Sequence, residues 1–349
     1  MTGFFESLLT GINQIVGNYG WAVIIFSLLI KAVLLPLDIK SRKSMRAMTA
    51  LNPKMEELKK RYGDDQEKLN RKMSELYKKN KVNPLSGCLP MLIQLPVLFI
   101  MFAAMRNIAA ELQLTQMYNW ITENLMEAGE FISLEKAQPL LDALRNGDIS
   151  SFGATDGWLW VKNVFQPDSF SKTIVPTMQE LSNLINQNKN VLSAEMMEVL
   201  KQYAANTGEL AASVDAAIAA HCDYFTFNLL ITMLPIKIPT NWSVYVNGWL
   251  ILPVLAGVTQ ILQTKLMNAG GSKANAAAAE NTQNAANGKF MKWFFPIFSV
   301  WICLSSTAAF SAYWVFVNLW SIVTNFAINK YLEAKTPQIV DDEKEAIQP

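Results

Sequence analysis

Residues 293–329 read WFFPIFSVWICLSSTAAFSAYWVFVNLWSIVTNFAIN and hold 37 consecutive positions without Asp, Glu, Lys or Arg. At the 1.5 Å rise of an α-helix this stretch would be roughly 55 Å long, whereas the hydrocarbon core of a bilayer is about 30 Å thick. One membrane span cannot accommodate it. We therefore divide the stretch at Ser305-Ser306-Thr307 and predict two membrane helices, 291–309 and 311–331, joined as a hairpin.

Three more apolar stretches have membrane-relevant lengths. Residues 82–105 and 238–264 lack charged side chains, and residues 21–37 carry only Lys31. Because a spanning helix needs about 20 apolar residues, we also predict spans at 20–38, 88–107 and 246–266. The composition agrees, with 51% hydrophobic and 17% charged residues, against roughly 25% charged residues in soluble chains. The predicted fold class is an all-α polytopic membrane protein with five transmembrane helices.

Positive charge is distributed unevenly between the segments that flank these spans. Residues 38–87 contain 14 Lys and Arg against 7 Asp and Glu, whereas residues 110–245 contain 7 against 15. Since basic loops stay in the cytosol, we expect the first segment inside and the second outside. The N-terminus then lies outside, the C-terminus lies in the cytosol, and the chain is a multi-pass protein of the cell membrane, that is, the plasma or inner membrane.

The segments outside the spans carry separate expectations. Residues 1–19 form an external amphipathic helix along the membrane surface. Residues 39–87 form a cytosolic helical hairpin with narrow apolar stripes and dense basic faces, in which Pro53 either kinks the first helix or marks its start. The basic faces are either solvated surfaces that set the orientation or docking sites for partners or anionic lipid headgroups. The other parts are an extended, mostly helical external loop 108–245, a cytosolic linker 267–290 and a cytosolic acidic tail 332–349.

Enzymatic motifs and metal-binding patterns are absent from the sequence. The three cysteines, Cys88, Cys222 and Cys303, are too far apart for a zinc pattern, and the one histidine, His221, has only Cys222 and Asp223 beside it. There is no glycine-rich phosphate loop, no nucleophile elbow and no carboxylate pair inside the spans. A net charge of +1 gives no bulk basicity for nucleic-acid binding. We therefore expect neither an enzyme nor a cofactor, and no direct readout of nucleic acid.

Lys31 is the one charge inside a predicted span, which makes it a functional candidate. Amide and hydroxyl side chains accompany it in other spans, namely Gln94, Gln260, Gln263, Ser321 and Asn325. These polar groups either bond the helices to one another or line a wet cavity within the membrane. Lys31 is either a tolerated lysine that extends its ammonium group toward the cytosolic end, about 9 Å away, or the positive centre of that cavity.

Several motifs resemble those of the YidC/Oxa/Alb family of membrane protein insertases. The most specific is KVNPLSGCLPMLIQLPV at 81–97, which is nearly the bacterial signature. Further similar stretches are GWAVII at 20–25, KAVLLPL at 31–37, SMRAM at 44–48, LNPK at 51–54, WLWVK at 158–162, LPVLAGVT at 252–259, YW at 313–314 and NL at 318–319. The resemblance covers roughly residues 18–110, 150–168 and 245–333.

The resemblance implies an insertase and chaperone of the five-span type, with the helices enclosing a hydrophilic groove that is open to the cytosol. A positive groove residue draws polar segments of nascent membrane proteins into the hydrated groove, and apolar segments pass into lipid without ATP hydrolysis. Lys31 occupies the matching position, and the five polar residues named with it are further groove candidates. The implied partners are nascent membrane proteins and membrane lipids, with the ribosome and the Sec translocon as further candidates.

The sequence departs from the family pattern at three places. The groove charge is typically Arg in the family, whereas Lys31 stands here and lacks the guanidinium fork. A Pro-Gly type break between the last two spans is replaced by Ser306-Thr307-Ala308-Ala309. Residues 112–150 and 169–241 look like insertions in the external loop.

Two other functions are compatible with these residues. A channel or secondary transporter would use Lys31 as an ion site, but it would favour broken helices or inverted repeats, and the sequence has no convincing internal repeat. A structural assembly factor would only hold other membrane subunits.

Overall fold

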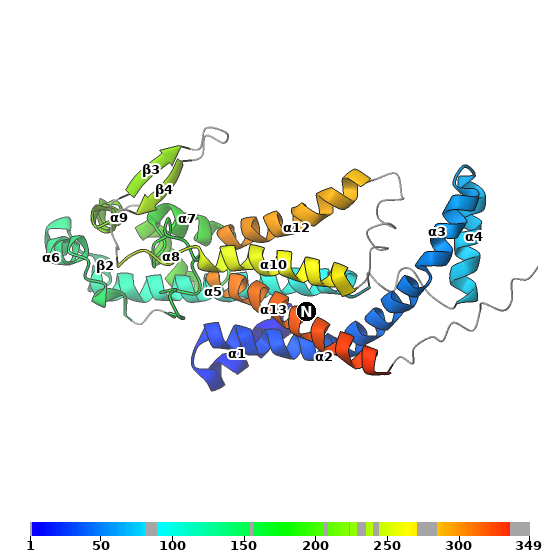
Figure 1. Ribbon diagram of the computed structural model, residues 1–349. Helices are drawn as coiled ribbons and strands as arrows, with labels where there is room; N and C mark the ends of the chain where they lie inside the picture. The colour runs from blue at the N-terminus through cyan, green and yellow to red at the C-terminus, as the bar shows by residue number, and fades with distance from the viewer. Residues whose placement is uncertain are drawn as a thin grey trace, which may run out of the picture. The chain divides into compact units, whose positions relative to one another are not determined.

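The structure is a computed structural model that describes residues 2–80, 89–153, 156–205, 209–222, 224–228, 235–239, 244–270 and 285–335. This part of the chain is mostly helical (Figure 1). It divides into two compact units. The first unit comprises Met1–Ser27, Leu98–Gly257 and Ile297–Phe316, and the second unit comprises Leu28–Val97, Val258–Pro296 and Val317–Pro349.

The longest helices of the described chain coincide over most of their length with the predicted spans. They are α2 (Tyr19–Ala50), α5 (Leu89–Asn124), α10 (Ile251–Gly270), α12 (Ala285–Ser305) and α13 (Ala308–Lys335). Three stretches are long and apolar enough to cross a membrane, namely Tyr19–Ser44, Leu95–Asn124 and Ala308–Tyr331. The apolar stretches of the other two helices, Ile251–Leu266 and Trp293–Ser305, are shorter. An all-α membrane protein fits this structure, and the set of five spans stays a prediction.

The charge-free stretch 293–329 is shared between α12 and α13. The first helix ends at Ser305 and the second begins at Ala308, so Ser306 and Thr307 form the junction despite the missing Pro-Gly pair. The break falls at the predicted division Ser305-Ser306-Thr307, whereas the predicted ranges 291–309 and 311–331 place the boundary a few residues later.

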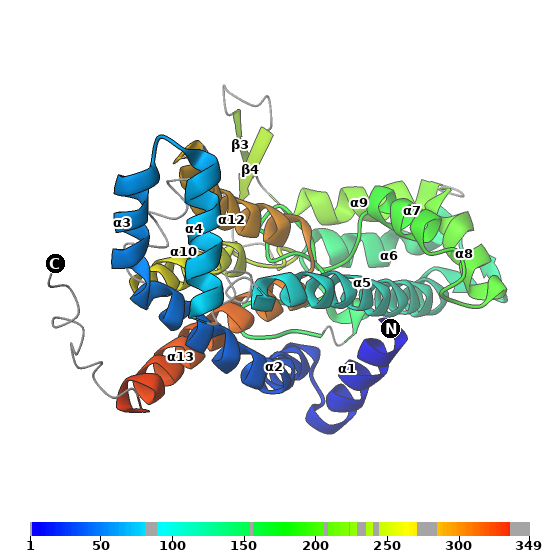
Figure 2. The same cartoon turned by 90° about the vertical axis from the view of Figure 1, so that its right-hand side faces the viewer.

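The helix that contains Lys31 continues well past its predicted end at residue 38. α2 runs to Ala50, because the polar residues that follow Leu37 include no helix breaker. Pro53 then occupies the first turn of α3 (Asn52–Tyr62), so it marks the start of that helix. Asp65 caps α4 (Gln66–Lys79) by accepting from the Lys68 backbone N–H. α3 and α4 lie side by side in both views, and Tyr77 Oη lies 3.6 Å from Met55 Sδ (Figures 1 and 2).

α5 also runs beyond its predicted end, from residue 107 to Asn124. Leu114, Met117 and Ile121 recur on one face of this extension, where they join a hydrophobic core with four shorter helices. These helices are α6 (Leu134–Arg145), α7 (Met178–Gln187), α8 (Ala194–Ala204) and α9 (Leu210–Ala220). Figure 2 shows α7, α8 and α9 gathered beside α6 and the C-terminal half of α5. The N-terminal helix α1 (Thr2–Val16) precedes α2.

Residues 108–245, which are predicted to be mostly helical, also contain short strands and a 3₁₀ turn. A short 3₁₀ turn covers Ser150–Phe152. Strand β1 (Met126–Glu127) pairs antiparallel with β2 (Glu130–Phe131), and β3 (Tyr224–Asn228) pairs with β4 (Pro235–Pro239) in a register that places Thr226 opposite Lys237. Residues 271–284 and 336–349, which hold most of the predicted linker and tail, lie outside the described residues.

The two ends of the segment 169–248 pair with each other. Ile174 N donates to Tyr245 O over 2.9 Å, Asn247 N donates to Lys172 O over 2.9 Å, and Gly248 N donates to Ser169 O over 3.3 Å. This pairing forms a stem that closes the insertion immediately before α10. A long insertion is thermodynamically tolerable at such a point, because its two ends are held together by the fold.

Candidate functional site

Lys31 lies on α2 in the second unit and is enclosed by protein. Its side chain is 8% exposed, whereas Val33 on the same helix is 75% exposed. Residues two positions apart on an α-helix point about 200° apart, so the Lys31 and Val33 side chains face nearly opposite sides of α2. The helix therefore turns its lysine toward the protein. This burial argues against a lysine that is merely tolerated on the lipid-facing side.

A line of polar side chains follows α13 in the same unit. Asn318, Ser321 and Asn325 are all buried and recur at intervals of three and four residues, so they share one face of the helix. Asn318 Nδ2 donates to Thr259 Oγ1 on α10 over 3.3 Å, which bonds the two helices. Ser321 Oγ donates to Val317 O over 2.8 Å within its own helix.

Asn325 differs from the other polar residues of that line. Its side chain is 3% exposed, and neither its Nδ2 nor its Oδ1 has a hydrogen-bond partner among the described residues. Gln263 Oε1 on α10 is likewise buried and without a partner in the described chain. Each such group costs about 1–3 kcal/mol when it is left unbonded away from water. The second unit thus holds buried amides whose bonding capacity the described protein does not use.

Two other predicted site residues carry less information. Gln260 is half-buried on α10, and its backbone oxygen accepts a hydrogen bond from Thr264 Oγ1 over 2.8 Å. Gln94 lies on α5, in a stretch whose side chains fall outside the described part of the structure.

The sequence analysis missed two charged residues on the Lys31 face of α2. Asp38 and Arg42 follow Lys31 by 7 and 11 positions, and both are half-buried. Arg42 Nε is enclosed and has no hydrogen-bond partner among the described residues. Neither is a predicted site residue, because the predicted span 20–38 ends at Asp38 and Arg42 falls in the predicted cytosolic segment 39–87. The signal that identifies them is their helical spacing from Lys31.

A second polar cluster, also missed, lies in the first unit around Asp168. This carboxylate is 0% exposed. It accepts hydrogen bonds from Trp249 N at 2.7 Å, Leu252 N at 2.7 Å and Trp160 Nε1 at 3.1 Å. It thereby caps the first turn of α10 from a point more than 80 residues earlier in the chain.

The segment that carries Asp168 bonds to other helices of the first unit. Ala308 N and Ala309 N, at the start of α13, donate to Gln166 O and Val164 O, both over 2.9 Å. Gln113 Nε2 on α5 donates to Phe165 O over 2.6 Å. These bonds satisfy backbone groups at the start of α13, which explains how that helix begins without a Pro-Gly break.

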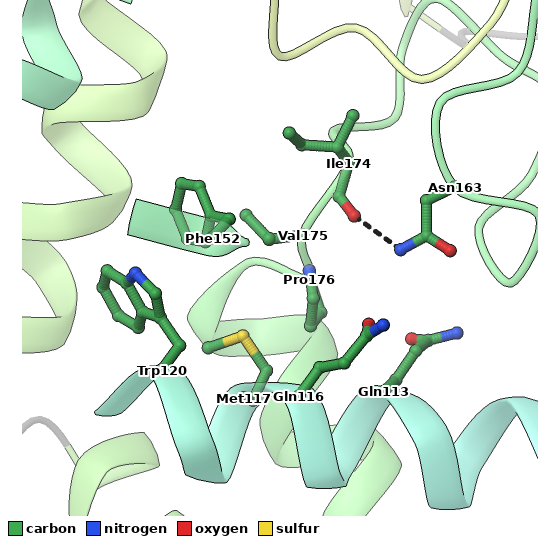
Figure 3. Close-up of a pocket in the computed structure, with 9 residues that line it drawn as sticks. All are labelled: Gln113, Gln116, Met117, Trp120, Phe152, Asn163, Ile174, Val175 and Pro176. Atoms are coloured by element: carbon green, nitrogen blue, oxygen red, sulfur yellow. Dashed lines mark hydrogen bonds between the residues drawn. The ribbon is translucent and has the colours of Figure 1, made fainter. Parts of the chain in front are cut away.

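A small pocket lies in the first unit between α5 and the extended residues before α7 (Figure 3). Its space of about 20 Å³ suits a water molecule but not a chain segment. Trp120 stacks on Phe152 at a ring-centroid distance of 4.9 Å, and Asn163 Nδ2 donates to Ile174 O over 2.9 Å (Figure 3). The other lining residues are Gln113, Gln116, Met117, Val175 and Pro176. The pocket is therefore too small to receive a polypeptide.

Histidine and cysteine side chains do not form a metal site within the described residues, where no group of three or more His, Cys, Asp or Glu lies close enough together. His221 packs edge-on against the Tyr245 ring with 5.7 Å between centroids. Cys222 and Cys303 are buried and form no disulfide within the described chain. Cys88 and Asp223 lie outside the described residues.

The chain is similar to known membrane proteins over almost its whole length. A family model described as 60Kd inner membrane protein matches residues 11–171 and 159–335. A Fusobacterium nucleatum protein named Membrane protein insertase YidC is 48% identical over 104 residues, which are 30% of this chain and 51% of that protein. Proteins of the same name from Pseudomonas entomophila and Thiobacillus denitrificans are 42% and 45% identical over 33% of this chain.

These pairwise matches cover only part of each relative. They span about half the length of the Fusobacterium protein, and 20% and 21% of the Pseudomonas and Thiobacillus proteins.

Proposed function

The chain belongs to the 60Kd inner membrane protein family, the family of the YidC/Oxa/Alb insertases, and we propose that it inserts nascent membrane proteins into the cell membrane. Its apolar helices and its relatives make it a multi-pass membrane protein. In our proposal five helices span the bilayer, with the N-terminus outside and the C-terminus, together with the α3–α4 hairpin, in the cytosol. The hairpin receives substrate, the ribosome or the Sec translocon on its basic faces.

The observation that carries the proposal is the pairing of a buried cation with unused buried amides in one unit. Lys31 is enclosed, and Asn325 has two buried polar atoms without a partner in the described chain. A hydrated groove would supply those partners and remove a penalty of about 1–3 kcal/mol for each group. Polar groups of a substrate can replace that water, because they offer the same donors and acceptors.

The mechanism follows from this chemistry. The ammonium group of Lys31 attracts polar or acidic residues of a nascent chain into the groove, where water and amides lower the barrier for moving them through the membrane. Apolar residues of the same chain gain stability in the surrounding lipid, by roughly 25 cal/mol for each Å² removed from water. Partition into lipid therefore drives the step, and ATP hydrolysis is not required. Gln94, Gln260, Gln263 and Ser321 complete the proposed lining.

Complementation of an insertase-depleted cell tests the role of the cation. Lys31→Arg should support growth, because it keeps the positive charge. Lys31→Glu should fail, since it repels acidic segments, and Lys31→Ala should be impaired only for substrates with acidic translocated tails. Full activity of Lys31→Glu would refute the electrostatic part of the mechanism.

Thiol labelling tests the groove directly. Single cysteines at residues 31, 33 and 325 in a background without native cysteines would be treated with a membrane-impermeant reagent from the cytosolic side. We expect labelling at 31 and 325, which line the groove, and none at 33, which faces lipid. Protection of all three would show that the second unit is dry.

A flux assay separates insertion from transport. The purified protein in proteoliposomes should insert a small test protein without conducting ions or small anions. Solute flux without insertion would instead identify Lys31 as the ion site of a channel or transporter.

A further inference from the structure

Three charged residues share one face of α2. Asp38 and Arg42 follow Lys31 by 7 and 11 residues, so at 100° per residue all three lie within about 40° of one another around the helix. At 1.5 Å per residue, Asp38 is about 11 Å and Arg42 about 17 Å further along the axis. The face thus presents a buried cation, an anion and a second cation in order toward the C-terminal end of α2.

Asp38 and Arg42 are more buried than Lys40, the exposed basic residue between them in the sequence. Asp38 and Arg42 are half-buried, whereas Lys40, on the opposite side of the helix, is exposed. Long basic side chains normally keep their charged groups in water. The Nε atom of Arg42 is instead buried by the protein, and it has no hydrogen-bond partner in the described chain. A guanidinium group with an unused donor is suited to bind a carboxylate, because its planar fork matches the two carboxylate oxygens.

Asp38 lies between the two cations and interacts electrostatically with both. Its spacing from Arg42, four residues toward the N-terminus, is the favourable order for an ion pair on a helix. An acidic residue of a substrate must therefore compete with Asp38 for Arg42 and for Lys31. The same carboxylate attracts basic residues, which both cations repel.

We propose that Asp38 and Arg42 set the charge selectivity of insertion: an acidic substrate residue binds Arg42 in place of Asp38 before it reaches Lys31. The idea rests on the insertase function proposed above. With all three charges present the face carries a net charge of +1 and favours acidic segments moderately. Without Arg42 the charges of Lys31 and Asp38 cancel, and without Asp38 the two cations act unopposed.

The alternative is an ion pair that only stabilises α2. The two explanations differ in whether the effect of a variant on insertion depends on the charge of the substrate. Loss of a structural pair would weaken the fold, so insertion of every substrate would fall by the same factor. Loss of a selectivity residue would change insertion according to the charge of the substrate, and the two single variants would act in opposite directions.

The experiment uses the full chain in proteoliposomes and three single-span test proteins that differ only in a translocated tail, which is acidic, neutral or basic. Arg42→Gln should lower insertion of the acidic tail several-fold and that of the neutral tail far less. Asp38→Asn should raise insertion of the acidic tail and lower that of the basic tail. Arg42→Lys should keep the preference for the acidic tail, because it keeps the charge.

Lys40→Gln is the matched control, since it removes one positive charge from the exposed side of the same helix. It should leave the insertion of all three test proteins unchanged. Equal losses for all three tails in Arg42→Gln and Asp38→Asn would overturn the selectivity proposal and identify a structural pair. Insertion of none of the tails by the unaltered protein would refute the insertase function itself, so the two failures are distinguishable.

Discussion

Two groups of buried polar side chains, the Asp168 cluster of the first unit and the amides Asn325 and Gln263 of the second, differ in their hydrogen bonding. In the first unit, Asp168 accepts three hydrogen bonds. The Asn247 side chain bonds to the backbone N–H and C=O of Asn163, and Asn163 Nδ2 donates to Ile174 O. In the second unit, Asn325 and Gln263 Oε1 are buried without a partner among the described residues. A buried group that is fully bonded stabilises one conformation. A buried group that is unbonded destabilises the fold unless water or a ligand reaches it. The Asp168 cluster is therefore structural.

Unbonded atoms do not mark a site by themselves, since Asn13 Oδ1, Trp158 Nε1 and Trp314 Nε1 of the first unit are also buried without a partner in the described chain. In the second unit they lie on helices of the unit that holds the buried Lys31, which is why we propose the site there.

The largest effect on stability is expected at Asp168. Asp168→Ala removes the carboxylate that accepts from two backbone N–H groups and one indole N–H, so the free energy of unfolding should fall by about 3 kcal/mol. Thermal unfolding of the detergent-solubilised protein measures the change. Asp142→Ala is the control, because Asp142 is exposed and pairs only with Arg145 at the surface, and its change should stay within about 0.5 kcal/mol. Equal melting temperatures for the two variants would show that the Asp168 cluster does not hold α10.

A smaller loss is expected at Tyr245, which is fully buried in the first unit. Its Oη donates to Leu144 O over 2.8 Å. Burial, with a lesser contribution from Asp148, raises the pKa of Tyr245 to about 12, so the hydroxyl stays a donor at neutral pH. Tyr245→Phe should lower the free energy of unfolding by about 1–2 kcal/mol.

Tyr118→Phe serves as the matched change for Tyr245→Phe. Tyr118 is half-buried on α5, where Thr122 Oγ1 donates to its backbone oxygen and not to its hydroxyl. Removal of that hydroxyl should leave the melting temperature nearly unchanged. If both variants melt alike, the bond to Leu144 contributes nothing and the first unit is less tightly bonded than its geometry indicates.

The comparison is sharpest on α13, where Asn318 and Asn325 lie seven residues apart on one face. Asn325→Leu removes two unbonded polar atoms, so the melting temperature should stay equal or rise, while insertion of an acidic-tailed protein falls. Asn318→Leu breaks the bond to Thr259 and should lower the free energy of unfolding by about 1 kcal/mol. A clear loss of stability in Asn325→Leu would mean that Asn325 bonds within the protein and is not part of a groove.

The sequence predicts the apolar helices well, because the absence of charge over 20 or more residues is a local property. It predicts less where partners are distant. Asp168 bonds to residues 81 and 84 positions away, and nothing near Asp168 in the sequence indicates them. Asn318 and Asn325 have the same residue type and the same periodicity, yet only the first has a partner on α10. Asp38 and Arg42 were missed because the predicted span ends at residue 38, although the helix continues to Ala50.

The smallest effect concerns Asp215, a residue intermediate between the two patterns. Its carboxylate is partly buried on α9 and accepts one hydrogen bond, from Met178 N over 2.9 Å. Burial raises the pKa of Asp215, and the nearby charge of Glu180 adds to this, whereas the bond from Met178 opposes it. The folded state therefore holds the proton more tightly than the unfolded state. Its contribution to stability is complete below the ordinary pKa near 4 and is lost as pH rises through the folded-state value.

Asp215→Asn should remove this dependence and make the protein relatively more stable at neutral pH, because a neutral amide still accepts from Met178. Melting temperatures measured from pH 4 to pH 7 test the change. Asp148→Asn should act with the opposite sign, since hydrogen bonds from Ser150 lower the pKa of Asp148 and favour its ionised form. If Asp215→Asn instead lowers the melting temperature at neutral pH, the carboxylate is bonded as completely as Asp168. Asp215 would then belong with the structural cluster and not between the two patterns.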